Sequence, residues 1–128
     1  MYKILVAGFI KIKRRIKMLL IRPLFCKYGK NFIFDPDGKY SYSTIEVGND
    51  VFIGSGANFS ASESKIILGN KIMFGPNVTI MGGDHNTSEL GKYMYDVKTK
   101  RPDNDLPVII KDDVWVGTGA IILKGVTI

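Results

Sequence analysis

Residues 108–128 read VIIKDDVWVGTGAIILKGVTI, and the spacing of the apolar residues in this stretch decides the fold. A helix repeats about every 3.6 residues and a half-buried strand about every 2, whereas large aliphatic residues recur here every six. A period of six requires a unit that turns a corner in each repeat. The first column of apolar residues comprises Ile110, Val116, Ile122 and Ile128, and a second column, four positions further on, comprises Val114, Ala120 and Val126.

The same period occurs twice upstream, and a glycine follows most of the large aliphatic or aromatic residues. A tightly wound coil has little internal volume, and glycine relieves the backbone at its corners, so the pattern predicts stacked short strands. The upstream first column comprises Val47, Ile53, Phe59, Leu68, Phe74 and Ile80, and the upstream second column comprises Val51, Ala57, Ile72 and Val78. The glycines are Gly48, Gly54, Gly69 and Gly75 upstream and Gly117 in the stretch 108–128.

These repeats resemble the hexapeptide-repeat acyltransferases. The resemblance implies a left-handed parallel β-helix with three six-residue strands in each coil of about 18 residues. The first column steps by 21 residues from Val47 to Leu68 and by 42 from Leu68 to Ile110, which exceeds one coil by 3 and by 24 residues. Two insertions are therefore expected to leave the coil, a short one within 60–65 and a loop at about 83–107.

Length and composition indicate one small domain, because the 128 residues are 45% hydrophobic and 23% charged. The lone Cys26 excludes an internal disulfide and is expected to be a small buried apolar residue. A reducing compartment fits this cysteine usage, so we expect a cytoplasmic protein. No metal site is expected, and a zinc hydratase of the same architecture is excluded because it needs three histidine ligands and the chain has one histidine.

Residues 1–27 are predicted to form a basic amphipathic helix, and residues 28–128 the β-helix. The first 30 residues carry nine Lys or Arg and no acid, but without interleaved aromatics or a known motif they do not indicate nucleic-acid binding. Residues 4–10 are uncharged, far fewer than the roughly 20 needed to cross a bilayer, and Pro23 should end the helix. The apolar face comprises Leu5, Phe9, Ile12, Ile16 and Leu19.

Two interpretations of this helix remain open. It could pack over the open end of the coil, which is the expected arrangement, or lie on the inner face of an anionic membrane with its bases toward the lipid. Residues 28–44 are rich in Gly, Pro, Ser and Tyr and predict turns, with residues 31–34 as an imperfect first rung.

His85 is the only histidine, and it lies where the regular repeat ends after Ile80 and a polar loop begins. Loops on rigid scaffolds often carry reactive groups, and histidine can accept a proton near neutral pH. Acetyltransferases of the resembled family carry a histidine at the root of a long loop, after a rung that reads like FGPNVTI (74–80). The alternative is an ordinary surface histidine.

Over residues 47–128 the pattern is similar to maltose- and galactoside-type sugar O-acetyltransferases and to polysaccharide-modifying acetyltransferases. That resemblance implies an acetyl-CoA-dependent O-acetyltransferase that modifies a hydroxyl of a sugar or glycan precursor, with His85 as general base. It also implies a homotrimer with its sites between subunits. A non-catalytic or degenerate β-helix with a scaffolding role is the alternative.

The same resemblance assigns further site residues. Asn77 and Asp84 are expected to contact the acceptor, and Trp115 and Thr118 to contact coenzyme A. The alternatives are a turn residue for Asn77, a solvated carboxylate for Asp84 and a subunit contact for Trp115. Family members usually continue for two or more coils beyond the position of Ile128, so the sequence is expected to be a fragment or a truncated product.

Overall fold

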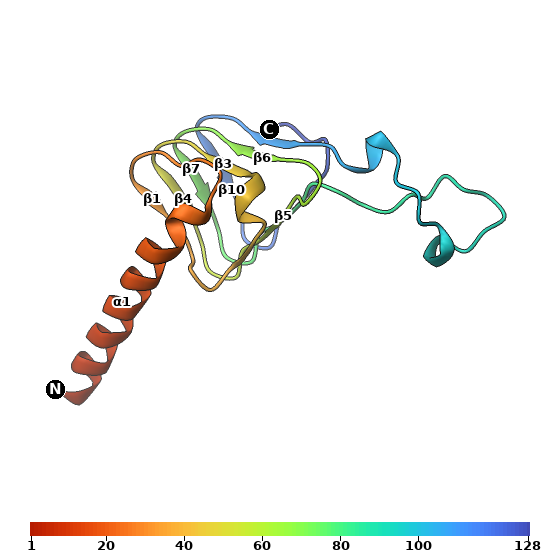
Figure 1. Ribbon diagram of the computed structural model, residues 1–128. Coiled ribbons are helices and arrows are strands. Elements are labelled where there is room, and N and C mark those ends of the chain that lie inside the picture. Colours follow the sequence, from red (N-terminus) through yellow and green to blue (C-terminus); the bar gives the residue numbers. More distant parts are fainter.

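The computed structural model describes residues 1–128 as one helix followed by a coil of short strands (Figure 1). Helix α1 (Tyr2–Ile21) continues into the 3-10 turn η1 (Arg22–Leu24). The strands are β1 (Phe32–Ile33), β2 (Lys39–Tyr40), β3 (Ile45–Val47), β4 (Val51–Ile53), β5 (Asn58–Ser60), β6 (Ile66–Leu68), β7 (Ile72–Phe74), β8 (Thr79–Met81), β9 (Val108–Ile110), β10 (Val114–Val116) and β11 (Ile121–Leu123). The other 3-10 turns are η2 (Tyr42–Thr44), η3 (Met94–Asp96) and η4 (Pro102–Asn104).

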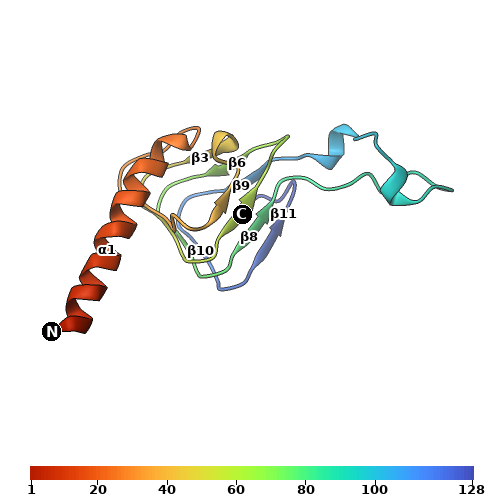
Figure 2. The ribbon, with the colours of Figure 1, turned by 60° about the horizontal axis from the view of Figure 1, so that its bottom comes forward.

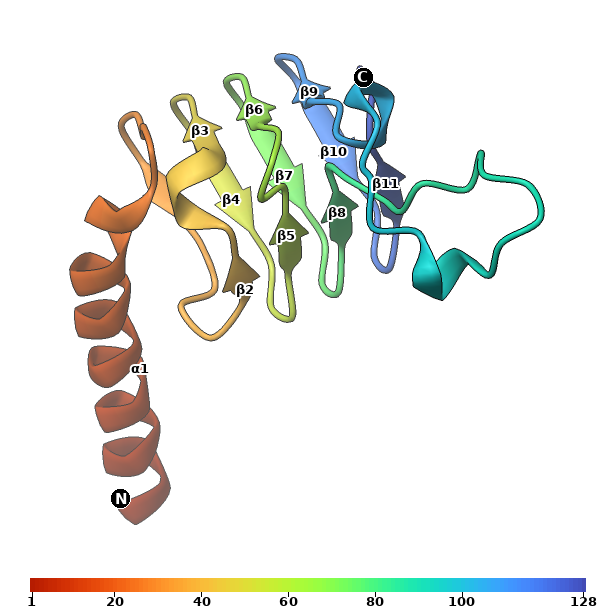
Figure 3. The ribbon, with the colours of Figure 1, turned by 45° about the vertical axis from the view of Figure 1, so that its right-hand side comes forward.

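Successive strands are assigned in turn to three parallel sheets, so the chain winds as a parallel β-helix (Figure 3). Face 1 is the sheet β1-β4-β7-β10, face 2 is β2-β5-β8-β11 and face 3 is β3-β6-β9. Val47 pairs with Leu68 and Leu68 with Ile110, at the steps that the sequence predicts. The fold is the expected left-handed β-helix, with the short insertion between β5 and β6 and residues 82–107 between β8 and β9.

The first-column side chains fill the interior, and from Val47 to Ile122 every one of them is buried. Ile128 and Val126 are exposed because no strand covers them. The imperfect first rung is a true rung, since Phe32 pairs with Val51. Aromatic rings close this end of the coil, with Phe25 packed edge-on against Phe32 at a centroid distance of 5.0 Å.

The corner glycines are needed because the backbones of neighbouring coils approach each other closely there. They do not adopt unusual backbone angles, so the explanation that glycine relieves the backbone at the corners was wrong. A Cβ on Gly54 would lie 2.8 Å from the carbonyl oxygen of Phe74 in the coil above. The positive φ angles fall two residues later, at Asp50 (58°), Lys71 (58°) and Asn77 (57°). The corner between faces 3 and 1 also carries a side-chain ladder, in which Asn49 N–H donates to Oδ1 of Asn70 at 2.8 Å.

Helix α1 ends before Pro23 as predicted, but it does not pack over the end of the coil. No residue of α1 is buried, and its only packing on the core is through the partly buried Met18 and Ile21 at its end. The aromatic rings already cover the first rung, so the apolar face of α1 is left exposed and the helix projects away (Figures 1 and 2). No helix of the protein has both the length and the apolar character needed to cross a membrane.

Cys26 is exposed, which corrects the expectation of a buried thiol. Its backbone N–H donates to the carbonyl of Tyr42 at 3.0 Å, and the neighbouring Lys27 forms a bridge to Glu46 on β3. The segment therefore runs along the rim of the first coil, while Phe25 occupies the interior position.

Gly54→Ala is expected to destabilise the fold, because the new Cβ would be within 3 Å of backbone atoms that cannot rotate away. A loss of about 1–3 kcal/mol in the free energy of unfolding is the usual cost of such overpacking. Gly117 occupies the same corner stack, but in the 128-residue chain a Cβ added there would meet nothing within 4 Å, so Gly117→Ala in that chain is the matched control and should be nearly neutral. Urea unfolding checks this, and equal stability of the two variants would refute the stacking explanation.

Candidate active site

Residues 82–107 form an arm that leaves the coil between faces 2 and 3 and projects well beyond it (Figures 1 and 3). The arm begins and ends in register, since Gly83 and Asp105 form an antiparallel bridge. The N–H of Asp84 donates to the carbonyl of Asn104 at 2.9 Å. A side chain at Gly83 would collide with the Asp105 carboxylate, so glycine is needed where the two segments meet. The root of the arm is thus held in place by its own backbone.

Asn104 holds the two candidate residues of the arm in place, a role that sequence reasoning missed. It is 6% exposed, and its Oδ1 accepts the N–H of Arg101 at 2.7 Å. Its Nδ2 donates to Oδ1 of Asp84 at 3.2 Å and to the carbonyl oxygen of His85 at 3.4 Å. Asn86, also buried, donates to the carbonyl of Thr99 at 3.0 Å and ties the next part of the arm together. The only available signal was the presence of asparagines in a polar loop, which does not distinguish a buried amide from a solvated one.

His85 is exposed between two hollows of the surface. One is a pocket of about 170 Å³ whose walls include Ser60 and Ser62 from the coil and Lys100 from the arm. The other, of about 540 Å³, is lined by arm residues that include Tyr95 and Lys98. A molecule in either hollow would lie beside the imidazole.

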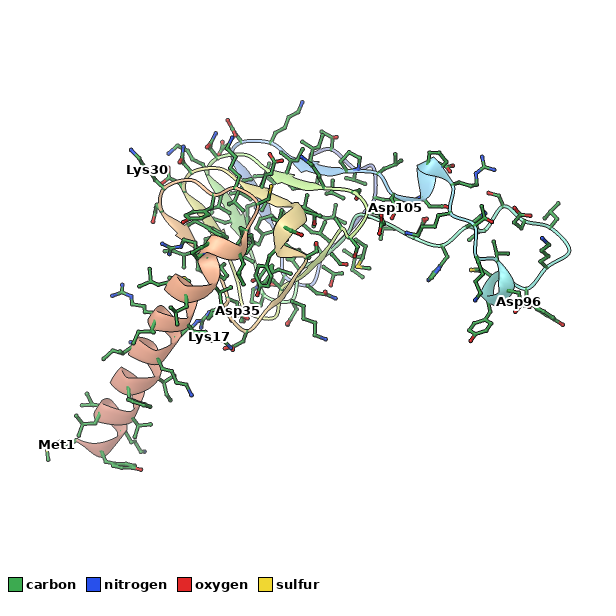
Figure 4. The ribbon with its side chains drawn as sticks, in the orientation of Figure 1. Met1, Lys17, Lys30, Asp35, Asp96 and Asp105 are labelled. Atoms are coloured by element: carbon green, nitrogen blue, oxygen red, sulfur yellow. The ribbon has the colours of Figure 1, made fainter.

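Two lysine–aspartate pairs surround His85. Lys100 Nζ lies 2.8 Å from both carboxylate oxygens of Asp105, and Lys124 Nζ lies 3.1 Å from Oδ1 of Asp84. Asp105 is labelled at the arm root in Figure 4. The carboxylate of Asp84 is therefore engaged through Oδ1, but its side chain is half exposed and keeps Oδ2 free of a protein partner.

Asn77 and Thr118 lie together at another corner, between faces 1 and 2. The N–H of Gly119 donates to the carbonyl of Pro76 at 2.9 Å, which stacks the two segments. Asn77 has a left-handed φ of 57° and its side chain lies against Gly56, so the turn interpretation describes its position. Because Asn77 precedes β8 and His85 follows it, the two lie at opposite ends of that strand. We call Asn77 and Thr118 the corner group, and Asp84 and His85 the arm group.

Trp115 points outward from β10 at the end of an apolar row on face 1. The row follows the strand register, in which Ile33 pairs with Phe52, Phe52 with Met73 and Met73 with Trp115. All four side chains are between 45% and 76% exposed. A contiguous exposed row of large apolar residues is typical of an interaction surface.

No protein-family model matches the chain. It is 32% identical over 117 residues to a galactoside O-acetyltransferase of Lactococcus lactis, covering 88% of this chain and 52% of that protein. It is 26% identical over 113 residues to the galactoside O-acetyltransferase of Escherichia coli, covering 85% of this chain and 51% of that protein. The chain thus spans about half the length of the curated relatives it matches.

Solved structures show the same fold. A hexapeptide-repeat-containing acetyltransferase from Vibrio cholerae superposes with a TM-score of 0.71 and 23% identity, covering 94% of this chain and 69% of that chain. Its complex with acetyl-coenzyme A superposes with a TM-score of 0.69 and 24% identity, covering 85% and 56%. The coil and its arm thus define a hexapeptide-repeat protein. Within that class, the chain is similar in sequence to the galactoside O-acetyltransferases, which confirms the resemblance seen in its residues.

Asn104→Ala is expected to loosen the root of the arm without unfolding the coil. The change leaves the N–H of Arg101 and the carbonyl of His85 without a side-chain partner. A lost buried hydrogen bond costs about 1–3 kcal/mol, so local opening should increase about tenfold or more. Hydrogen exchange of residues 83–86 and 101–105 measures this. Asp103→Ala, at the neighbouring exposed side chain, is the control, and equal exchange in both variants would show that Asn104 does not hold the arm.

Proposed function

We propose that the protein is an O-acetyltransferase that moves the acetyl group of acetyl-CoA to a hydroxyl of a sugar or glycan precursor. The observation that carries the proposal is the position of His85, at the rigid root of the arm and beside both hollows. Support comes from the relatives named galactoside O-acetyltransferases and from the acetyl-CoA complex of the Vibrio protein, which has the same fold.

The chemistry requires a base because a sugar hydroxyl has a pKa far above neutrality and must lose its proton as it attacks. In the proposed step, the acceptor oxygen bonds to the thioester carbonyl carbon while the imidazole of His85 takes the hydroxyl proton. The tetrahedral oxyanion is stabilised by a hydrogen-bond donor and collapses with cleavage of the carbon–sulfur bond. The imidazolium returns the proton to the departing thiolate, so the protein ends unchanged and no covalent acyl-enzyme is formed.

The arm group supplies the reacting end of the proposed site. Asn104 holds the backbone carbonyl of His85, so the imidazole extends from a fixed point. Oδ2 of Asp84 is proposed to accept a hydrogen bond from an acceptor hydroxyl while Oδ1 stays bound to Asn104 and Lys124. Lys98 lines the larger hollow and forms no ion pair, so its ammonium suits a phosphate of coenzyme A, whereas the amine of Lys100 is held by Asp105.

The corner group is proposed to act on a neighbouring subunit. Asn77 would contact the acceptor, and Thr118, with Trp115, would contact coenzyme A. Asn77 and His85 lie at opposite ends of β8, which favours contact of the corner group with the His85 of another subunit. We therefore propose a homotrimer in which the corner group of one subunit faces the arm group of the next. The apolar row of face 1 supports this arrangement, because it offers an unpartnered surface beside the corner group.

His85→Ala should lower turnover by about 10² to 10⁴, the usual contribution of a general base, with little change in coenzyme A affinity. Proton removal is needed only in the transition state, so catalysis and binding should separate. Thiol release from acetyl-CoA with a galactoside acceptor, measured on the whole protein, provides the rate, and calorimetry provides the affinity. His85 is the only histidine among these 128 residues. A variant that keeps more than about a third of the rate would make His85 a bystander.

The whole protein should be a trimer by light scattering. Met73→Asp, in the middle of the apolar row, should dissociate it because a carboxylate would be buried without a partner. Leu123→Asp is the control, since Leu123 on face 2 is as exposed as Met73, at 57%. A folded wild-type monomer, or dissociation by both variants alike, would contradict the assignment of the interface to face 1.

The proposed place of action is the cytoplasm, where acetyl-CoA is available, at the inner face of the membrane.

A further inference from the structure

Helix α1 is held to the coil by one side only. Met18 and Ile21 pack on the core, Arg14 lies 3.6 Å from Asp35, and Lys17 forms an ion pair with Asp37. Figure 4 shows Lys17 and Asp35 where α1 meets the coil. The side-chain hydrogen bond from Lys17 holds the pKa of Asp37 below its ordinary value. Asp35 is itself buried and accepts the N–H of Gly56 at 2.9 Å, so the contact is anchored in the coil. These contacts fix the rotation of the helix about its axis.

The apolar stripe of α1 faces away from the coil. At about 100° per residue, the residues held to the coil and the residues of the stripe fall on roughly opposite sides of the helix. The stripe is continuous over the length of the helix, and its side chains are between 53% and 68% exposed. It comprises Leu5, Phe9, Ile12, Ile16 and Leu19.

Basic residues border the stripe on both sides. Lys11 and Arg15 lie along one edge and Lys13 along the other, by the same 100° rule. The ion pairs of α1 use only Arg14 and Lys17, so none of these three bordering bases forms an ion pair. A surface that offers apolar side chains between unpaired cations needs a partner with an apolar interior and an anionic border.

We propose that α1 binds flat on an anionic phospholipid surface. The stripe would enter the boundary between headgroups and acyl chains, and the bordering bases would contact lipid phosphates. A nucleic acid would satisfy the bases but leave the stripe in water. A second α1 would cover the stripe but bring like charges together along both edges. Because the stripe faces away from the coil by the 100° rule, lipid binding would leave the coil and the arm on the aqueous side.

Flotation with vesicles tests the proposal on the whole protein. Binding is expected to vesicles that contain phosphatidylglycerol and not to pure phosphatidylcholine, and it should weaken as salt is raised. Ile12→Ser should weaken binding about tenfold or more, because one large apolar side chain leaves the lipid. Ile10→Ser is the matched control, since Ile10 is 58% exposed and Ile12 60%, but Ile10 lies off the stripe. The affinity of the Ile10→Ser variant for the vesicles should change by less than about twofold.

The charge contribution is tested with the combined change Lys11→Gln, Lys13→Gln and Arg15→Gln, which should weaken binding at least about tenfold. Lys30→Gln, Lys39→Gln and Lys111→Gln together remove the same charge from exposed sites off the helix and should bind nearly as the wild type does. Turnover on a soluble acceptor should be unchanged in both triple variants, so failure of the lipid contact is distinguishable from failure of the proposed activity.

Three results would overturn the proposal. Equal losses from Ile10→Ser and Ile12→Ser would show that the stripe is not the lipid surface. A change of oligomeric mass without lipid on Ile12→Ser would assign the stripe to a second copy of the chain. The bases would be assigned to nucleic acid if the protein bound RNA more tightly than anionic vesicles and if the variant with Lys11→Gln, Lys13→Gln and Arg15→Gln lost that RNA binding.

Discussion

Parallel pairing of each strand with the strand one coil above it is the constraint on which the structure depends. The pairing joins Val47 to Leu68 and Leu68 to Ile110, and it brings corner glycines such as Gly54 within 3 Å of the next backbone. A coil stacked this closely has no room for additional residues, so the 26 residues from 82 to 107 must leave it at a corner. The insertion is thereby given a fixed root, and His85 is next to that root.

The same winding separates the polar residues of one chain. Asn77 and Thr118 belong to the corner that enters face 2, and Asp84 and His85 follow the corner that leaves it. The interior of the coil between the two groups is filled by buried side chains such as Ile80 and Phe59. We propose that a catalytic site that uses both groups forms between subunits, with the apolar row of face 1 as the contact surface.

The period of six predicted the coil, its register and the position of the arm because each depends on local spacing. Residues whose role depends on tertiary contacts were not predictable in this way. Asn104 is buried by an arm that closes on itself, Cys26 is exposed because Phe25 takes the interior position, and α1 projects because aromatic rings already cover the first rung. The helix itself and its end before Pro23 were predicted, but which of its faces meets the coil is decided by Asp35 and Asp37, remote in sequence.

Mixed assembly of two inactive variants tests most directly whether the site is shared between subunits. His85→Ala removes the proposed base of the arm group, and Asn77→Asp removes the amide donor of the corner group while keeping a residue that tolerates a left-handed φ. When the two chains are coexpressed, random trimers should recover about a quarter of the wild-type rate. An interface is active only when one chain brings an intact Asn77 and its neighbour an intact His85, and each condition is met about half of the time. A rate no higher than that of either variant alone would show that each chain uses only its own residues, and would contradict the account.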